Sequence, residues 1–190
     1  MSISFLRALL RAPHSVGAIW PSSPALAREM VRASALEGTS AVVELGPGSG
    51  AFTGHILANL PSGARFLAIE KCPILTREVS AKFPGACIVE GCATRLGHHL
   101  AEHDVSTPGA ILSGLPWAIF SDDLQNAILH QVRDNLGTDG VFSTFAYYGP
   151  HKWGAGRAFR KKLQAHFSEV ERSAVVLRNI PPAFVYSCRR

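Results

Sequence analysis

Long hydrophobic runs, cysteine clusters and a heavy load of charge are all missing from this 190-residue sequence. No segment approaches the roughly 18 consecutive apolar residues of a membrane-spanning helix, so we expect no transmembrane segment. The four cysteines show no C-x-x-C spacing, and a chain of this length needs no disulfides, so we expect free thiols in a cytoplasmic protein. Charged residues make up 17% and apolar residues 47%, which excludes a disordered chain and predicts one globular domain.

Acidic residues are the scarcer charge, because 14 Asp and Glu stand against 19 Lys and Arg, for a net charge of +5. A basic surface favours an anionic partner, and net charge alone does not choose between a nucleic acid and a membrane face. Residues 1–12 predict an amphipathic helix with Arg7 and Arg11 beside its apolar face, which would dock peripherally on an anionic membrane. A helix packed on its own domain is the alternative.

Alternating apolar segments predict the fold. A helical extension over 14–37 precedes an α/β core over 41–190, and together with the first helix they form one domain over 1–190. The expected strands are 41–45, 65–69, 87–89, 110–113, 141–147, 170–177 and 183–188, and the expected helices are 24–36, 50–60, 73–82, 94–103, 122–136 and 157–167. We therefore predict a Rossmann-like, doubly wound, mostly parallel seven-stranded sheet that ends in an antiparallel hairpin with an antiparallel edge strand.

A glycine-rich turn follows the first expected strand, in the segment Glu44-Leu45-Gly46-Pro47-Gly48-Ser49-Gly50. Glycines let a backbone turn tightly and approach a ligand, and such a loop lies at the ligand-binding edge of an open α/β sheet. A dinucleotide site is one interpretation, because the spacing also fits G-x-G-x-x-A, and a plain turn is another. Glu44 opposes the dinucleotide, since an anion repels a pyrophosphate but suits a cationic amino group or sulfonium. Pro47 also lacks an N–H for phosphate.

Glu70 ends the second expected strand, where a carboxylate can accept both hydroxyls of a ribose. NAD and S-adenosylmethionine share that ribose, so Glu70 supports a nucleoside cofactor of either kind. A solvated strand-end carboxylate is the alternative.

These residues resemble the class I S-adenosylmethionine-dependent methyltransferases. Three further segments are similar to the bacterial phospholipid N-methyltransferases, which methylate phosphatidylethanolamine toward phosphatidylcholine: 16–23, 113–116 and 179–183. The ribosomal RNA adenine dimethyltransferases are a more distant resemblance. The resemblance implies S-adenosylmethionine as cofactor, with its methionine half held by Glu44, Gly46, Gly48 and Gly50 and its ribose by Glu70.

One departure from the family pattern follows the third strand. The resembling enzymes have Gly-Asp-Ala there, with the Asp bound to the adenine amine, whereas this sequence has Gly91-Cys92-Ala93. Cys92 and Ala93 are therefore the expected adenine neighbours, without the acid. A non-catalytic protein that binds S-adenosylmethionine or lipid stays open as an alternative for this reason.

The end of the fourth strand carries the expected acceptor residues. Methyl transfer to an amine needs no protein nucleophile, only positioning and exclusion of water. The residues that we expect to act there are Ser113, Leu115, Pro116, Trp117 and Tyr147, with Ser113 also beside the cofactor. A backbone carbonyl would accept amine hydrogens, and Trp117 would stack on the developing cation, with a core tryptophan as the alternative. Of Tyr147 and Tyr148, strand geometry lets one face the site.

No metal site is expected. His98, His99 and His103 lack the cysteine or glutamate partners of a zinc site, so we expect a solvated helix face. No dense Lys/Arg stripe with interleaved aromatics supports RNA. The sequence thus predicts methylation of phosphatidylethanolamine at a membrane surface, with RNA adenine N6-methylation as the alternative, and it does not determine the oligomeric state.

Overall fold

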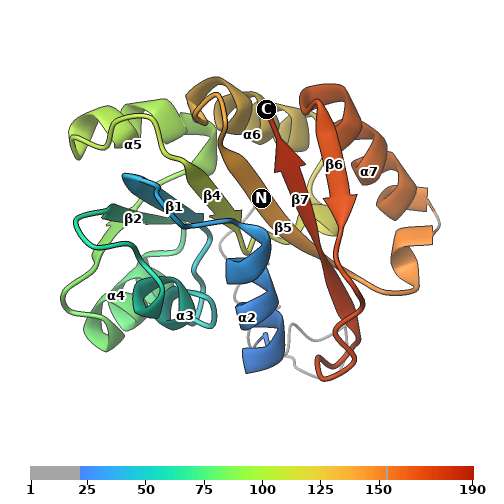
Figure 1. The fold of residues 1–190 in the computed structure, drawn as a ribbon, viewed down its shortest axis with the longest axis horizontal. Coiled ribbons are helices and arrows are strands. Elements are labelled where there is room, and N and C mark those ends of the chain that lie inside the picture. The colour runs from blue at the N-terminus through green and yellow to red at the C-terminus, as the bar shows by residue number, and fades with distance from the viewer. Residues whose placement is uncertain (1–21, 153) are drawn as a thin grey trace.

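A seven-stranded sheet organises the computed structural model, which describes residues 22–152 and 154–190 (Figure 1). The strands are β1 (Ala41–Leu45), β2 (Arg65–Glu70), β3 (Cys87–Glu90), β4 (Ala110–Ser113), β5 (Val141–Tyr147), β6 (Glu169–Arg172) and β7 (Ala183–Arg189). Their order across the sheet is β3-β2-β1-β4-β5-β7-β6. β1 to β5 run parallel, and β7 is antiparallel to both of its neighbours. The predicted Rossmann-like, mostly parallel sheet with an antiparallel C-terminal pair is confirmed.

The sequence analysis expected an antiparallel strand at the edge of the sheet. The strand that runs antiparallel to β1–β5 is β7, and it is not the edge strand. β7 lies between β5 and β6, so β6 is the edge strand. β6 also ends at Arg172, short of the expected Leu177. The side chain of Ser173 explains this end, because its hydroxyl accepts the Val185 N–H at 3.0 Å and takes the place of a strand carbonyl.

The helices follow the predicted order. The helix predicted over 73–82 has its predicted ends, and the others are shifted at one or both ends. The helices are α2 (Pro24–Ala33), α3 (Thr53–Ala58), α4 (Pro73–Lys82), α5 (Leu96–Glu102), α6 (Asp122–Asn135) and α7 (Gly154–His166), with short 3-10 turns η1 (Ala93–Arg95), η2 (Trp117–Ile119) and η3 (Pro150–Lys152). Ser23 caps α2 by accepting the Leu26 N–H, and Ser121 caps α6 in the same way. α3 is shorter than the expected 50–60, because turns occupy the residues up to Phe52.

Alternate residues of each strand bury on opposite faces of the sheet. On one face, Val42 and Leu112 pack in a cluster with α2 and α3. On the other face, Val43 and Ile111 pack in a cluster with α5, α6 and α7. Figure 1 shows these two groups of helices on opposite sides of the strands. The sheet is therefore covered on both faces, which leaves its edges and strand ends for ligands.

Candidate active site

The carboxyl ends of the parallel strands bring the predicted site residues to one edge of the sheet. This edge is the row of strand ends, not the outermost strand β3 or β6. The glycine loop follows β1, Glu70 ends β2, Ser113 ends β4 and Tyr147 ends β5. β1 lies between β2 and β4, and Leu45 pairs with residues of both strands, so the first three of these ends adjoin one another. The segment after β3 lies at the same edge, one strand further away.

The glycine loop adopts a backbone that only glycine accepts freely. Gly46, Gly48 and Gly50 have φ angles of 72°, 56° and 82°, all in the left-handed region. A Cβ on Gly46 would lie 2.7 Å from the Leu115 side chain, and one on Gly50 would lie 2.7 Å from the ring of Phe83. A Cβ on Gly48 would meet no atom within 4 Å. The loop is thus packed at both ends and open at Gly48.

The N–H groups of the three glycines are already hydrogen-bonded inside the protein. Gly46 donates to the Ile69 carbonyl at 2.9 Å, Gly50 donates to the Pro47 carbonyl at 2.8 Å, and Gly48 donates to Oε2 of Glu70 at 3.1 Å. A pyrophosphate at such a loop needs free N–H groups. The geometry therefore argues against a dinucleotide site, as Glu44 and Pro47 do in the sequence.

Glu44 is a fully buried carboxylate with one free oxygen. Its Oε2 accepts a hydrogen bond from Thr53 Oγ1 at 2.7 Å, and its Oε1 has no hydrogen-bond partner among the described residues. Burial raises the pKa of Glu44 to about 8, the Thr53 hydrogen bond opposes this shift, and the nearby charge of Glu70 adds to it. A cationic group beside Oε1 would offset the free-energy cost of ionising this buried carboxyl, and it would supply the missing hydrogen bond.

Glu70 joins the end of β2 to the glycine loop. Its Oε1 accepts the Cys72 N–H at 2.9 Å while its Oε2 accepts the Gly48 N–H. The residue is only 6% exposed, which excludes the solvated strand-end alternative. An ionised carboxylate has about four acceptor positions, so two remain for a ligand.

The segment after β3 rests on a buried histidine that sequence reasoning placed in solvent. His99 is 7% exposed, and a Cβ on Gly91 would collide with its Nε2. Burial lowers the pKa of His99. The helical spacing of His99 with the buried Leu96 was the signal that the prediction of a solvated face overlooked. Cys92 is half-buried, and its Sγ lies 3.1 Å from Thr94 Oγ1.

Ala93 is buried beside Cys92 in η1. No group of three or more His, Cys, Asp or Glu side chains suited to a metal occurs within residues 22–152 and 154–190. All four cysteines are free thiols, as the sequence predicts.

A closed hydrogen-bond network at the ends of β4 and β5 corrects the role expected for Trp117. Its Nε1 donates to Ser113 Oγ at 3.2 Å and to Thr144 Oγ1 at 3.0 Å. The indole is 4% exposed and stacks on Phe159 with centroids 4.9 Å apart. A ring held this way packs in the core, as the alternative interpretation proposed, and does not form a wall that a cation could reach. Ser113 is also fully buried.

The turn after Ser113 lies against the glycine loop, because a Cβ on Gly114 would be 2.6 Å from the Gly46 backbone oxygen. Pro116 has φ −82° and ψ 71°, and the Trp117 N–H donates to the Leu115 carbonyl at 3.0 Å, which is an inverse γ-turn. The Ser113 carbonyl accepts from Thr144 Oγ1 at 3.2 Å. The Gly114 carbonyl accepts no hydrogen bond from the described residues, so it is the free acceptor of this turn.

A row of aromatic rings that the sequence analysis missed runs from the glycine loop to Tyr147. Phe52 follows the loop and meets Phe145 edge to face at 5.7 Å, and Phe145 meets Tyr147 in the same way at 5.6 Å. The Phe52 ring also lies close to Gly114, since a Cβ there would be 3.6 Å from it. Tyr147 is half-buried, and Tyr148 is 43% exposed. Phe145 sits two residues before Tyr147 on the same face of β5, which was the available signal.

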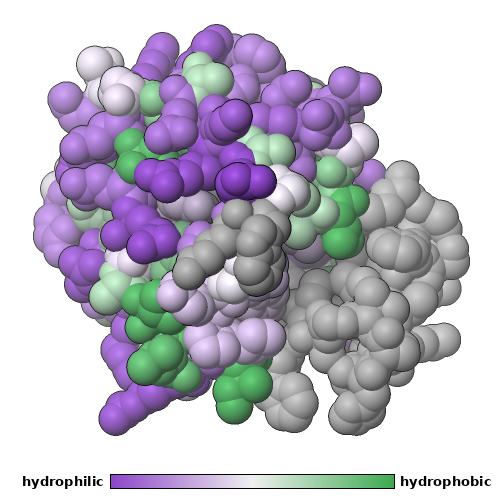
Figure 2. Space-filling view, turned by 90° about the vertical axis from the view of Figure 1, so that its right-hand side faces the viewer, coloured by the Kyte–Doolittle hydropathy of each residue, from purple (hydrophilic) through white to green (hydrophobic). Residues whose placement is uncertain are grey.

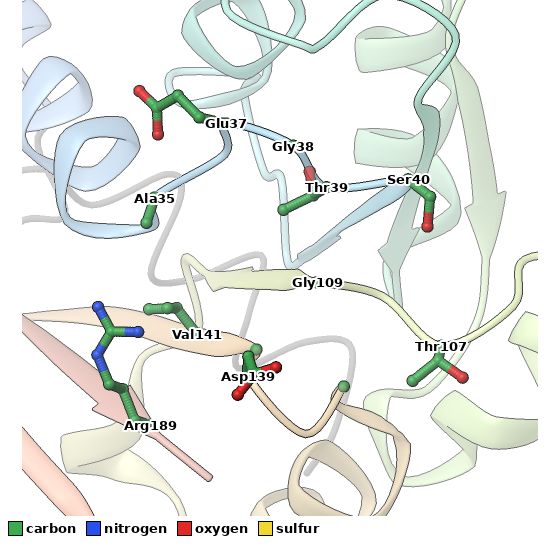
Figure 3. Close-up of a pocket in the computed structure, with 12 residues that line it drawn as sticks. Ala35, Glu37, Gly38, Thr39, Ser40, Thr107, Gly109, Asp139, Val141 and Arg189 are labelled. Atoms are coloured by element: carbon green, nitrogen blue, oxygen red, sulfur yellow. The ribbon is translucent and has the colours of Figure 1, made fainter.

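A pocket of about 390 Å³ lies at the opposite edge of the sheet (Figure 3). It is formed by the connection from α2 to β1 and the segments before β4 and β5, which include Thr39, Gly109 and Asp139. It contains no predicted site residue and stands at the amino ends of the strands. Ligands of open α/β sheets bind at the carboxyl ends, so we place the candidate site there.

The predicted membrane helix over 1–12 and the segment 16–23, apart from Ser22 and Ser23, lie outside the described residues. Within the described part of the chain, no helix combines the length and the apolar character needed to cross a bilayer.

Comparisons with known proteins point in one direction. No family model matches the sequence. An ornithine lipid N-methyltransferase of Singulisphaera acidiphila is 29% identical over 188 residues, which span 97% of this chain and 94% of that protein. A ribosomal RNA small subunit methyltransferase A of Chlorobaculum parvum is 34% identical over 108 residues, which span 57% of this chain and 36% of that protein. The solved O-methyltransferase of Bacillus cereus in complex with SAH superposes with a TM-score of 0.71 at 12% identity, over 100% of this chain and 92% of that one.

The chain has the class I S-adenosylmethionine-dependent methyltransferase fold. The resemblance recognised in the sequence is thereby confirmed. Its relatives and structural neighbours are methyltransferases, and solved ones hold SAH or S-adenosyl-L-methionine. The enzyme class and the cofactor that the sequence predicts are thus those of its relatives.

The residues at the methyltransferase cofactor edge fit S-adenosylmethionine. That molecule carries a cationic amino group and a sulfonium. The Oε1 of Glu44 has no hydrogen-bond partner among the described residues, and a cation beside it would favour the ionised form of this buried acid. The glycine loop has open space at Gly48, where a Cβ would meet no atom within 4 Å. The free acceptor positions of Glu70 suit a ribose. Cys92 fits the cofactor less well than these residues do, since a thiol accepts hydrogen bonds poorly from an adenine amine.

Proposed function

We propose that this chain is an S-adenosylmethionine-dependent N-methyltransferase whose acceptor is the primary amine of a membrane lipid. The observation that supports a lipid acceptor is the similarity to the ornithine lipid N-methyltransferase, which is 29% identical over an alignment that spans 97% of this chain. Phosphatidylethanolamine, to whose methyltransferases the sequence is similar, is the second acceptor that we propose. Both lipids present a primary amine, so one site serves either.

The cofactor half of the site would be built by the ends of β1, β2 and β3. In this proposal Glu44 pairs with the cationic amino group, the open face at Gly48 receives the methionine chain and Glu70 holds the ribose. Gly46 and Gly50 shape the loop, and Cys92 and Ala93 lie beside the adenine. The burial of the Glu44 carboxyl supports this assignment, because a bound cation stabilises the ionised form that burial disfavours.

The acceptor half would use backbone more than side chains. S-adenosylmethionine supplies a methyl group already activated on a sulfonium. The amine must be neutral, since its lone pair forms the new N–C bond while the C–S bond breaks, and the methylated ammonium then loses a proton to solvent. In this proposal the Gly114 carbonyl accepts an amine hydrogen and aligns that lone pair. Tyr147 and Phe52 would shield the new charge with their rings.

Methyl transfer from labelled S-adenosylmethionine tests the proposal. Phosphatidylethanolamine, ornithine lipid and ribosomal RNA are offered side by side, the lipids in vesicles with an anionic lipid. We expect label in one or both lipids and none in RNA. Glu44→Gln serves as the impaired variant, and Glu90→Gln, which changes an exposed acid at the same sheet edge, serves as its matched control.

Two other outcomes would replace this proposal. Label in RNA alone would favour an RNA adenine N6-methyltransferase, a candidate that rests on the match to ribosomal RNA methyltransferase A over 57% of this chain. Cofactor binding without transfer to any acceptor would favour a non-catalytic relative, and the missing acid at Cys92 would then be the first residue to restore.

A further inference from the structure

The large hydrophobic side chains that are exposed among the described residues gather at the candidate-site edge of the sheet. They are Ile119 (42% exposed), Tyr148 (43%), Leu177 (75%) and Ile180 (76%). Ile119 follows β4 and Tyr148 follows β5, whereas Leu177 and Ile180 precede the antiparallel β7 and so lie at the same edge. Single exposed hydrophobics are ordinary on a protein surface, but their collection at one edge marks an interaction site.

The most exposed pair sits on an anchored turn. Asn179, between Leu177 and Ile180, is 4% exposed, and its Oδ1 accepts the Ser23 N–H at 2.9 Å. Its Nδ2 donates to the Pro181 carbonyl at 2.7 Å, and its own N–H donates to a carbonyl across the turn at 3.2 Å. The turn is therefore held to α2 from its centre. Its two apolar side chains are exposed by this geometry rather than by a loose backbone.

The space-filling view shows the same concentration. On the side of the molecule drawn in Figure 2, hydrophobic residues gather at the lower end, where Figure 1 places the connection from β6 to β7. Arg178 stands between the two apolar residues in the sequence and is exposed as well. Apolar side chains beside a cationic one suit the boundary between acyl chains and anionic headgroups.

We propose that the turn of residues 177–180 docks on an anionic lipid bilayer, with Leu177 and Ile180 inserted at the headgroup boundary and Arg178 against the headgroups. This inference rests on the proposed lipid acceptor and adds the surface through which the acceptor arrives. β7, which follows the turn, is three strands from β1, so these two strands lie about 14 Å apart across the sheet at about 4.8 Å per strand. A leaflet docked there presents its amine headgroups at the ends of β4 and β5.

Vesicle flotation with the cofactor-free, full-length protein tests the surface. Vesicles of phosphatidylcholine with phosphatidylglycerol are compared with vesicles of phosphatidylcholine alone. We expect Leu177→Ser/Ile180→Ser to weaken binding on the order of tenfold or more, as expected for two partly inserted side chains. Arg178→Ala should weaken binding to the anionic vesicles alone. Arg189→Ala, at the opposite edge of the sheet, is the matched control for charge and should bind as the unmodified protein does.

A gain of binding gives an independent measure. Ile180→Trp should strengthen flotation, since tryptophan favours the membrane interface. Thr107→Trp, which adds the same side chain at an exposed position of the opposite edge, should leave flotation unchanged. Equal flotation of the Leu177→Ser/Ile180→Ser variant and the unmodified protein would overturn the docking surface, as would the absence of flotation by the unmodified protein. A change of oligomeric state in the serine variant with unchanged flotation would assign the turn to protein contact instead.

Methyl transfer separates this proposal from the proposed function. The Leu177→Ser/Ile180→Ser variant should transfer methyl groups normally to lipid dispersed in detergent and poorly to lipid in vesicles, with unchanged affinity for S-adenosylmethionine. If the unmodified protein methylates no lipid but its flotation still depends on Leu177 and Ile180, the proposed function fails and the docking surface stands. If lipid methylation is found but flotation ignores both residues, the docking surface alone fails.

Discussion

The two halves of the candidate site treat their polar groups in opposite ways. At the ends of β1 and β2, two buried carboxylates lie close enough for Glu70 to raise the pKa of Glu44, and one oxygen of Glu44 has no partner among the described residues. At the ends of β4 and β5, Ser113, Thr144 and Trp117 are neutral and bond to one another. The first half thus holds a buried acid that a bound cation would ionise and pair. The second half is rigid, and it offers a ligand only its backbone.

This contrast separates binding from positioning. A region with an unsatisfied buried polar group is stabilised by its ligand, whereas a region with a closed hydrogen-bond network is fully paired before the ligand binds. Substitutions in the first half should therefore act on cofactor affinity and on pH dependence. Those in the second half should act on transfer and on stability.

The largest effect is expected where the two halves touch. A Cβ on Gly114 would lie 2.6 Å from the backbone oxygen of Gly46, so Gly114→Ala forces the β4 turn away from the glycine loop. We expect methyl transfer to fall on the order of a hundredfold, as displacements of about 1 Å at a site do, and stability to fall by about 1–3 kcal/mol. Gly85→Ala, in open space, is the control. Normal activity of Gly114→Ala would mean that the two halves are not in contact.

The pH dependence of stability is the second effect. The folded protein keeps the Glu44 proton up to a pKa of about 8, whereas the unfolded chain releases it near 4.5. The folded state therefore binds more protons between these values, and the free energy of unfolding falls as pH rises through this window, by up to about 1.4 kcal/mol per pH unit.

Denaturant unfolding of the cofactor-free protein at pH 5, 6.5 and 8.5 measures this fall. Glu44→Gln should remove it, so the difference between the two proteins should narrow, and then reverse in favour of the variant, as pH rises. If the free energy of unfolding changes with pH in the same way for the two proteins, Glu44 ionises normally. The contrast between a charged and a neutral half of the site would then be wrong.

The same substitution measures what the charge contributes to cofactor binding. Glutamine keeps an oxygen for the Thr53 hydroxyl but loses the charge that faces the cofactor amino group. We expect Glu44→Gln to weaken S-adenosylmethionine binding on the order of thirtyfold, because hydrogen bonds between charged groups contribute about 2 kcal/mol. Calorimetry with Glu90→Gln as control checks this, and equal affinities would remove Glu44 from the binding site.

The smallest effect is a gain. Cys92→Asp restores the acid of the resembling enzymes, and Thr94 Oγ1, now 3.1 Å from the thiol, can donate to it. We expect about tenfold tighter S-adenosylmethionine binding from a new hydrogen bond to the adenine amine. Cys87→Asp, at an exposed thiol on β3, should leave affinity unchanged. Weaker binding of Cys92→Asp would show that Cys92 does not lie beside the adenine.

Much of the charged half could be predicted from the sequence, because it depends on local geometry. The loop has a left-handed backbone at positions 46, 48 and 50, and the glycines at these positions indicate this backbone in the sequence. Glu44 and Glu70 occupy strand ends, which the apolar runs before them locate. What the sequence does not contain is the bond from Gly48 to Glu70, since it joins residues 22 positions apart.

The neutral half was harder, because burial there is decided by distant partners. Trp117 looks the same in the sequence whether it faces a ligand or Phe159 of α7, which follows 42 residues later in the chain. The row from Phe52 to Tyr147 joins two elements for the same reason. His99 was assigned to solvent by its residue type, although its position on the buried face of α5 indicated otherwise.

The position of β7 has a consequence for how the chain assembles. β6 precedes β7 in the sequence but pairs with β7 and with no other described strand, so it has no partner in the sheet until residues 183–189 are in place. During synthesis, β5 keeps an open edge through the whole of α7 and β6, and an open edge is a template for intermolecular pairing. A chain cut between β6 and β7 loses two strands instead of one. Completion of the sheet thus depends on one strand, because β7 covers the open edge of β5 and at the same time provides the pairing edge for β6.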